Sequence, residues 1–205
     1  FHEILTHIRY SEKVFFMKRL LLILILTLSF QTLIKADDIR DFEIEGISIG
    51  DSLLKIFTEN EILSNIVDYG YKSDKFTIFE IDSPSKFENY ESLQVAFLKK
   101  DKNFIIYSIS AAIFYDNKID QCEKKKEIVF KALKKTFKNT YHDKQKDKLS
   151  GDTTGKSTYT RYAFYFPDSE FIGVSCYDWV DKWTDNLRVE IYSNKYNNWL
   201  NNEAF

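Results

Sequence analysis

The sequence predicts an α+β protein in which helices pack on one face of an antiparallel sheet. Two observations lead to this class: β-branched and aromatic residues form successive strand-like runs, and two helical zones interrupt those runs. A helix followed by three strand-like runs occurs twice, at about 51–115 and 119–192. An arrangement of two α-βββ halves is therefore an alternative, although the two stretches show no residue-level repetition.

The first half is expected to begin with a strand at Phe42–Gly50, followed by two short helices. Asp51 or Ser52 can cap the first helix, DSLLKIF, by accepting from the backbone of its first turn. Thr58 and Glu61 have the spacing of a capping box, which predicts the second helix, TENEILSNI. Three strands are then predicted, at residues 75–81, 92–99 and 103–115, with a hairpin loop at 99–103.

The second half is expected to begin with the longest helix, at about residues 119–139, capped by Asp116 or Asp120. A polar loop is predicted to follow at about 140–156. The remaining pattern predicts three more strands and a C-terminal tail, NKYNNWLNN, for which we expect one helical turn. These strands are expected at residues 157–166, 170–180 and 187–192, with a turn at Pro167-Asp168.

Residues 17–36 have the layout of a secretory signal peptide. Lys18 and Arg19 precede an apolar run, Leu20–Phe30, and Ala36 is the small residue at the expected cleavage point. The apolar run is about half of the ~20 residues needed to span a bilayer. We therefore expect cleavage and no stable membrane span afterwards, with a retained anchor as the alternative.

The position of the only methionine, Met17, suggests where translation begins. Residues 1–16 are therefore expected to lie upstream of the translated protein. Residues 37–205 are expected to form a single exported α+β domain, periplasmic or secreted in a bacterium. The full chain has a formal net charge of −2, which gives no general attraction to nucleic acid or to anionic membranes.

Two cysteines, Cys122 and Cys176, remain after the leader. An exported protein meets an oxidising compartment, so a pair indicates a disulfide, and two buried thiols are the alternative. Period two along residues 170–180 places Cys176 on the core side of a strand, and helical spacing places Cys122 in an apolar stripe. Both sulfur atoms should therefore face one helix–sheet interface, and we predict a disulfide between them.

The stretch GDTTGKST, residues 151–158, is similar to a phosphate-binding loop. Such a loop needs four residues between its glycines, and only three separate Gly151 from Gly155. It must also follow a strand and open a helix, whereas this stretch follows a charged segment and leads into a predicted strand. We therefore predict no nucleotide site and a flexible loop.

His142 is the only histidine after the leader, since His2 and His7 lie within residues 1–36. Multi-histidine metal sites are thereby excluded, and the charged stretch around His142 predicts a solvated position. We expect neither a metal nor a cofactor.

A basic run extends from Glu123 to Lys148, with ten lysines against four acidic side chains. Another envelope protein or an anionic surface could bind Lys124–Lys148. The run contains no arginine and few aromatic residues, so we expect no nucleic-acid partner. The alternative is the solvated side of an amphipathic helix followed by a mobile lysine-rich loop.

The segment CYDWVDKWTDN, residues 176–186, brings aromatic and acidic residues together. Such a group could bind a sugar or form a recognition hot spot, and paired carboxylates could serve glycoside hydrolysis. The alternative is a set of core and edge aromatic residues beside an aspartate-rich turn. The candidate binding residues are Tyr177, Trp179, Trp183, Asp178 and Asp181, with Asp185 nearby.

The element FEIEGISIGDSLL, with Phe42, Gly46, Gly50 and Asp51, resembles a group of small secreted proteins of unknown function from marine alphaproteobacteria. This resemblance covers about 30 residues well and implies export and a shared fold, without a known active site. More loosely, a strand followed by a helix pair and a three-stranded meander resembles the beta-lactamase-inhibitor-protein-like fold. That fold implies a protein-binding module, and the lipobox cysteine of its lipoprotein members is absent here.

The sequence contains no catalytic constellation, so we expect an exported, non-enzymatic binding or protein-interaction module. The first alternative is a carboxylate-dependent hydrolase that acts on an envelope or glycan substrate through aspartates in residues 178–185. The second is an adaptor that uses the lysines of residues 123–148. The identity of the partner is not encoded in any recognisable motif.

Overall fold

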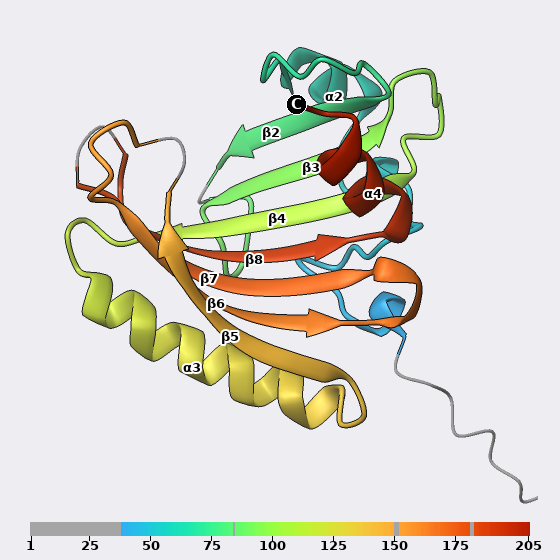
Figure 1. The fold of residues 1–205 in the computed structure, drawn as a ribbon. Helices are drawn as coiled ribbons and strands as arrows, with labels where there is room; N and C mark the ends of the chain where they lie inside the picture. Colours follow the sequence, from blue (N-terminus) through green and yellow to red (C-terminus); the bar gives the residue numbers. More distant parts are fainter. Residues whose placement is uncertain (1–37, 84, 150–151, 181–182) are drawn as a thin grey trace, which may run out of the picture. The chain divides into compact units, whose positions relative to one another are not determined.

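A computed structural model describes residues 38–83, 85–149, 152–180 and 183–205 (Figure 1). All of them belong to one compact unit, residues 37–205. The upstream residues 1–16 and the signal peptide 17–36 lie outside the described residues, so both stay predictions.

The core of this unit is an antiparallel sheet whose eight strands lie in the order β1-β2-β3-β4-β8-β7-β6-β5. Helices accompany this sheet, so the predicted α+β class is confirmed. The strands are β1 (Ile66–Val67), β2 (Phe76–Asp82), β3 (Ser92–Leu98), β4 (Ile106–Phe114), β5 (Tyr141–Lys148), β6 (Thr158–Tyr165), β7 (Phe171–Asp178) and β8 (Asn186–Tyr192).

Helices lie on both faces of the sheet (Figure 1). The long helix α3 packs on one face, mainly against β7 and β8, together with the N-terminal segment and α2. The C-terminal helix α4, where one helical turn was expected, packs on the opposite face. The helices are α2 (Glu59–Ser64), α3 (Ile119–Thr136) and α4 (Asn194–Asn202), with short 3-10 turns η1 (Ile39–Asp41), η2 (Leu53–Lys55) and η3 (Pro167–Ser169).

The sheet order divides the unit into two similar halves. Each half is a helix followed by four consecutive antiparallel strands, α2-β1-β2-β3-β4 and α3-β5-β6-β7-β8. The last strands of the halves, β4 and β8, pair with each other at the centre of the sheet. The alternative of two α-βββ halves is thus close to the observed arrangement, with one further strand in each half.

The additional strand of the second half corrects one prediction. Residues 141–148 form β5, although the sequence predicted a polar loop there. The segment YHDKQKDK contains no apolar alternation because β5 is an edge strand that pairs only with β6. Lysines along an edge strand also discourage pairing with other chains. The charged pattern therefore marks an edge position.

Local backbone conformation corrects two further predictions. The predicted strand Phe42–Gly50 is a tight turn, in which Ile44 and Ile47 bridge each other across Glu45 and Gly46. Both turn residues have positive φ, 51° and 79°, and glycine adopts this conformation without strain. Neither Asp116 nor Asp120 caps α3, because Lys118 is the N-cap residue and no side chain caps it.

Two other caps form as predicted. Thr58 and Glu61 make the reciprocal capping box of α2, with the Glu61 Oε2 atom 2.8 Å from the Thr58 backbone nitrogen. Ser52 caps η2, since its hydroxyl accepts from the Leu54 N–H at 3.2 Å. These caps hold the segments that cover the β2–β4 side of the main core.

Candidate binding face of the sheet

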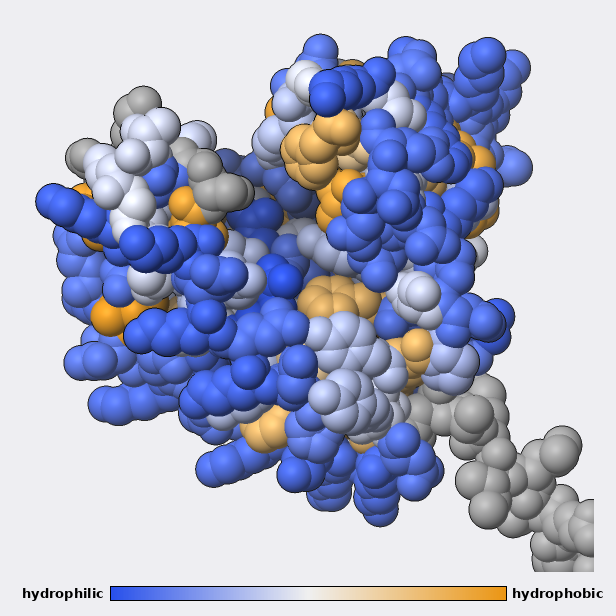
Figure 2. Space-filling view, viewed as in Figure 1, coloured by the Kyte–Doolittle hydropathy of each residue, from blue (hydrophilic) through white to orange (hydrophobic). Residues whose placement is uncertain are grey.

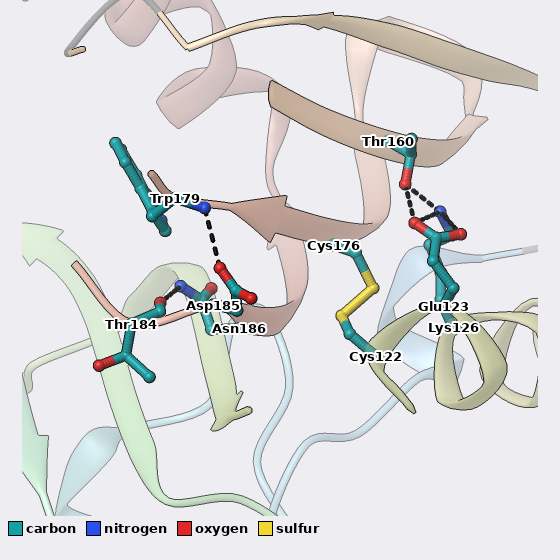
Figure 3. The surroundings of a disulfide bond; sticks show 9 residues. All are labelled: Cys122, Glu123, Lys126, Thr160, Cys176, Trp179, Thr184, Asp185 and Asn186. Carbon is teal, nitrogen blue, oxygen red and sulfur yellow. Dashed lines mark hydrogen bonds and ion pairs between the residues drawn. A yellow bond between two sulfur atoms is a disulfide. The ribbon is translucent and has the colours of Figure 1, made fainter. Parts of the chain in front are cut away.

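The face of the sheet that packs against α3 is closed by apolar side chains and by one disulfide. Cys122 of α3 and Cys176 of β7 are joined, and their Cα atoms lie 5.9 Å apart (Figure 3). Both side chains are buried among core residues such as Ile172, Val174 and Leu133. The predicted pairing is present, and it fixes the helix to the sheet.

One buried cation accompanies this disulfide. The Lys126 ammonium is fully buried and donates to the Glu123 carboxylate at 2.8 Å and to the Thr160 hydroxyl of β6 (Figure 3). Burial lowers the pKa of Lys126, and the hydrogen bond and charge of Glu123 oppose that shift. Because every partner lies within the helix–sheet interface, this cluster anchors α3 and offers no open site.

The opposite face is divided by α4 into an apolar half and a polar half. Residues paired across neighbouring strands share one face, so the sheet register shows which side chains lie together. The row under α4 is mainly apolar: Ile78, Ala96, Ser108, Tyr192 and Phe171. The next two rows are mainly polar: Glu80, Gln94, Ser110, Glu190 and Gly173, then Asp82, Ser92, Ala112, Arg188, Ser175 and Arg161. We call these two rows the polar floor.

A hydrogen-bonded ion pair occupies one side of the polar floor. The Arg161 guanidinium lies 3.2 Å from the Glu190 carboxylate and donates to Ser175 Oγ at 2.8 Å and to the Tyr177 hydroxyl at 3.1 Å. Tyr192 donates to the second Glu190 oxygen at 2.8 Å. The Glu190 carboxylate is thus buried with partners on both oxygens, as a buried charge requires.

Close packing around Glu190 depends on a glycine in the adjacent strand. A Cβ atom at Gly173 would lie 2.8 Å from the Phe171 ring and 3.2 Å from a Glu190 oxygen. Any larger residue would therefore displace that ring or the carboxylate, which fixes the ion pair in position.

The other side of the polar floor contains a charge pair bridged by an amide. Gln94 accepts from Arg188 at 3.4 Å through its oxygen and donates to Glu80 at 3.0 Å through its nitrogen. Tyr69 also donates to Glu80. The two guanidinium groups therefore differ. Arg161 contacts a carboxylate directly, whereas the contacts of Arg188 with other described residues are to neutral acceptors, Gln94 and Ser110, at 3.4 and 3.5 Å.

Three of the predicted binding residues form a row of aromatic rings at the end of β7. The ring centroids of Tyr177 and Trp179 lie 6.4 Å apart, with planes within 12° of parallel. Tyr159 of β6 stacks on the other side of Tyr177 at 5.9 Å, and Trp183 lies 6.2 Å from Trp179. Because Tyr177 also contacts Arg161, this aromatic row borders the polar floor.

The predicted aspartates do not join this row as a group. Strand alternation places Asp178 on the α3 face, opposite to Tyr177. Asp185 is buried and accepts from the Trp179 backbone N–H at 2.9 Å, so it holds the segment that carries the tryptophan (Figure 3). Burial raises the pKa of Asp185. Asp181 lies outside the described residues.

The face is hollowed where the polar floor lies uncovered. Figure 2 shows a recess between the loops that end the β5–β6 and β7–β8 hairpins and the part that contains α2 and β2. At the β1–β2 edge, a cavity of about 250 Å³ is lined by residues that include Tyr69, Tyr71 and Lys99. Tyr69 belongs both to this cavity and to the Glu80 cluster, which connects the cavity to the floor.

One buried acceptor near the aromatic row has no partner. Asn186 of β8 pairs with Tyr177 across the sheet, and its amide nitrogen donates to the Thr184 carbonyl at 3.0 Å. Its Oδ1 atom is buried and accepts no hydrogen bond from the described residues. An unsatisfied buried acceptor is costly, so this oxygen could take a donor from water or from a ligand.

The basic run occupies the α3 side of the molecule. On β5, alternation places Lys144, Lys146 and Lys148 on the α3 face, next to the exposed lysines of that helix. Lys126 is the exception, because it is buried. His142 is half-buried on β5, where its ring packs against the Phe130 and Phe164 rings at centroid distances of 5.5 and 5.4 Å, so it lies in a strand and not in the predicted loop.

The stretch resembling a phosphate loop contains a turn organised by one carboxylate. Asp152 accepts from the backbone N–H groups of Thr154, Lys156 and Ser157 at 2.7–3.0 Å. These hydrogen bonds lower the pKa of Asp152, so a negative charge already occupies the backbone donors that a phosphate would need. The predicted flexibility stays a prediction, and Gly151 lies outside the described residues.

The polar floor was missed from the sequence, although strand alternation contains its signal. In LRVEIY, Arg188 and Glu190 alternate with apolar residues, and TYTRY places Arg161 in the same phase as Tyr159. Each strand alone suggests ordinary solvent-facing residues. Only the sheet order brings these three charges together.

No group of three or more metal-ligating side chains lies together within the described ranges. In the same part of the chain, no helix has the length and apolar character needed to cross a membrane.

Comparison of the chain with known protein families, with curated proteins and with solved structures gives no match. The resemblance carried by residues 42–54 therefore stays a prediction, and function is argued from the site alone.

Proposed function

We propose that this protein is an exported, non-enzymatic binding module whose ligand lies on the polar floor, against the aromatic row. The observation that carries this proposal is the uncovered half of the sheet face, where two arginines and two glutamates border a row of half-buried aromatic rings that ends at the exposed Trp183. The Cys122–Cys176 disulfide supports export, because such bonds persist in oxidising compartments.

The composition of this face fits binding better than simple contact with water. Arg161, Glu190 and Glu80 are half-buried or buried and are held by specific hydrogen bonds, which gives them fixed positions. Trp183 is 64% exposed although tryptophan contributes strongly when it is buried at an interface. Ligand sites are usually concave and combine aromatic side chains with a few polar groups held in fixed positions, and this face has both components.

The experiment compares wild-type protein with two surface variants on arrays of glycans and peptides. The double variant Trp179→Ala/Trp183→Ala removes the aromatic row. The matched control, Lys131→Ala/Lys135→Ala, removes two exposed charges of α3 on the opposite face. We expect bound ligands to be lost by the tryptophan variant and retained by the lysine variant.

The reverse result would indicate that the ligand binds the basic surface of residues 124–148. If ligands were lost only in the lysine variant, the partner would be an envelope protein or anionic surface held by residues 124–148. If the array showed no ligand that depends on either surface, the proposal would be wrong.

The hydrolase alternative needs two carboxyl groups across one cleft. Of the aspartates in residues 178–185, Asp178 lies on the α3 face and Asp185 is buried, where it accepts from the Trp179 backbone N–H, so these two do not line one cleft. Glu80 and Glu190 of the polar floor are three strand spacings apart, or about 14 Å, whereas pairs that hydrolyse glycosides lie at about 5–9.5 Å. An assay for cleavage of any array ligand distinguishes the alternatives, because a binding module releases its ligand intact.

A further inference from the structure

We infer that the ligand of this face is an acidic oligosaccharide, with a sugar carboxylate held by Arg188 and a neighbouring sugar ring stacked on the aromatic row. This inference rests on the proposed function and adds the chemical class of the ligand.

The surroundings of Arg188 indicate that this side chain can bind a carboxylate. This side chain is half-buried on the polar floor, and within the described residues it forms no ion pair. Its two acceptors, Gln94 Oε1 and Ser110 Oγ, are neutral and lie at the long distances of 3.4 and 3.5 Å. A guanidinium carries five N–H donors, and a carboxylate can accept two of them in parallel.

Comparison with Arg161 shows what Arg188 lacks. Arg161 of β6 lies on the same face as Arg188 of β8, with Ser175 of β7 between them in the same row. Its charge is compensated directly by Glu190. No carboxylate of the described residues lies within ion-pair distance of Arg188, and its acceptor Gln94 donates in turn to Glu80. A bound carboxylate would therefore give Arg188 the direct partner that Arg161 already has.

Arg188 also lies between the two groups of aromatic residues that border the floor. Its positive charge acts on the Tyr177 hydroxyl on one side and on the Tyr69 hydroxyl on the other, where it partly offsets the effect of burial on both pKa values. A carboxylate bound to Arg188 would therefore lie beside the aromatic row.

The hydrogen-bonding groups of the floor favour a sugar over a peptide. An extended peptide that binds a sheet usually pairs with the backbone of an edge strand. The floor strands β3, β4, β8 and β7 are each paired on both sides, so they present only side chains. The half-buried Gln94 amide matches the hydroxyl groups of a sugar, and the nearly parallel Tyr177 and Trp179 rings offer it a stacking surface.

The test uses ligands that differ only in charge. A tetrasaccharide of galacturonate and its fully methyl-esterified form have the same rings, but the ester lacks the carboxylate charge. Isothermal titration to wild-type protein should show binding of the acid at least about tenfold tighter than that of the ester, since a hydrogen bond to a charged group contributes this much. A hexaglutamate peptide forms the third arm and should bind more weakly than the acidic sugar.

Three variants identify the contacts. Arg188→Gln should reduce affinity for the acid about tenfold and leave affinity for the ester unchanged. Trp183→Ala, at an exposed position, should weaken both sugars and does not depend on the integrity of the floor. Arg40→Gln is the control, because it removes an exposed arginine that is distant from Arg188 in the sequence. It should change the affinity for neither sugar. Thermal unfolding of each variant shows whether it is folded.

Three results would overturn the inference: equal binding of acid and ester, tighter binding of hexaglutamate, or an unchanged affinity of Arg188→Gln. The array experiment separates this failure from failure of the proposed function. If array ligands still depend on Trp179 and Trp183, the binding face remains and only the acidic sugar is rejected.

Discussion

The two faces of the sheet hold their charged side chains in different surroundings. On the α3 face, a helix, a disulfide and apolar side chains exclude water, and the one buried cation, Lys126, is held by groups of the interface itself. On the opposite face, α4 covers only one half. There, the Arg161–Glu190 pair and the Glu80–Gln94–Arg188 bridge lie side by side without a covering element.

This difference separates structural residues from functional ones within single strands. Along β7, Ile172, Val174 and Cys176 face α3, whereas Ser175 and Tyr177 face the polar floor. A change to the first group should mainly alter stability. A change to the second should mainly alter binding, with a smaller effect on stability, and the following predictions test that distinction.

The largest effect is expected from the disulfide. Replacing both Cys122 and Cys176 with alanine should lower the free energy of unfolding by about 4 kcal/mol, since the bond closes a loop of 54 residues. Urea unfolding of the variant and of wild type, with and without reductant, measures this loss. Reductant should destabilise only wild type, and equal sensitivity of both proteins would contradict the assignment.

A smaller effect is expected from neighbouring positions of β7. Ile172→Ala should cost about 3 kcal/mol, because it opens a cavity in the α3 core. Ser175→Ala should cost about 1 kcal/mol, because it removes one hydrogen bond to Arg161. Urea denaturation of both variants compares the faces on one strand, and a larger loss for Ser175→Ala would show that the polar floor carries the stability.

The two cation–carboxylate pairs, Arg161–Glu190 and Lys126–Glu123, should differ in the same sense. Arg161→Met leaves the Glu190 carboxylate buried, at 6% side-chain exposure, and should cost about 2 kcal/mol. Lys126→Met leaves Glu123 37% exposed to water, so its cost should be about 1 kcal/mol. Thermal and urea unfolding measure both, and Glu190→Gln in the Arg161→Met background should recover part of the loss. Equal costs would remove the distinction between the two charge pairs.

Much of the fold follows from local patterns in the sequence. Strands with one apolar face, the capping box at Thr58 and Glu61, and the paired cysteines are each visible without tertiary information. The strand β5 was missed because an edge strand needs no apolar residues, and α4 was underestimated because asparagine-rich segments form helices mainly when their aromatic residues are buried. Trp199 and Tyr196 supply that burial, against strands remote in the sequence.

The candidate site was only partly visible for a related reason. Tyr177, Trp179 and Trp183 are close in the sequence, so their grouping could be predicted from composition. Arg161, Arg188 and Glu80 come from three strands of both halves, and their proximity depends on the β4–β8 pairing that joins the halves. No local pattern predicts that pairing.

The smallest expected effect concerns the tyrosines that border the polar floor. Burial raises the pKa of Tyr69, Tyr177 and Tyr192, and the negative charges of Glu80 and Glu190 add to the shift. These phenols should therefore ionise at higher pH than a free tyrosine, whose pKa is about 10. Their contribution to stability is fully present below pH ~10 and is lost as the pH rises through the folded-state values. Ultraviolet absorbance of phenolate during alkaline titration should show them as a late-ionising group.

Two glutamine substitutions assign this group to the polar floor. Glu190→Gln removes the charge beside Tyr177 and Tyr192 and should let them ionise at lower pH, while Tyr69 is unaffected. Glu80→Gln should act on Tyr69 instead, since that carboxylate accepts from its hydroxyl. If neither variant moved the alkaline titration, burial alone would account for the late ionisation. The two glutamates would then not form the charged floor that distinguishes this face from the apolar α3 face.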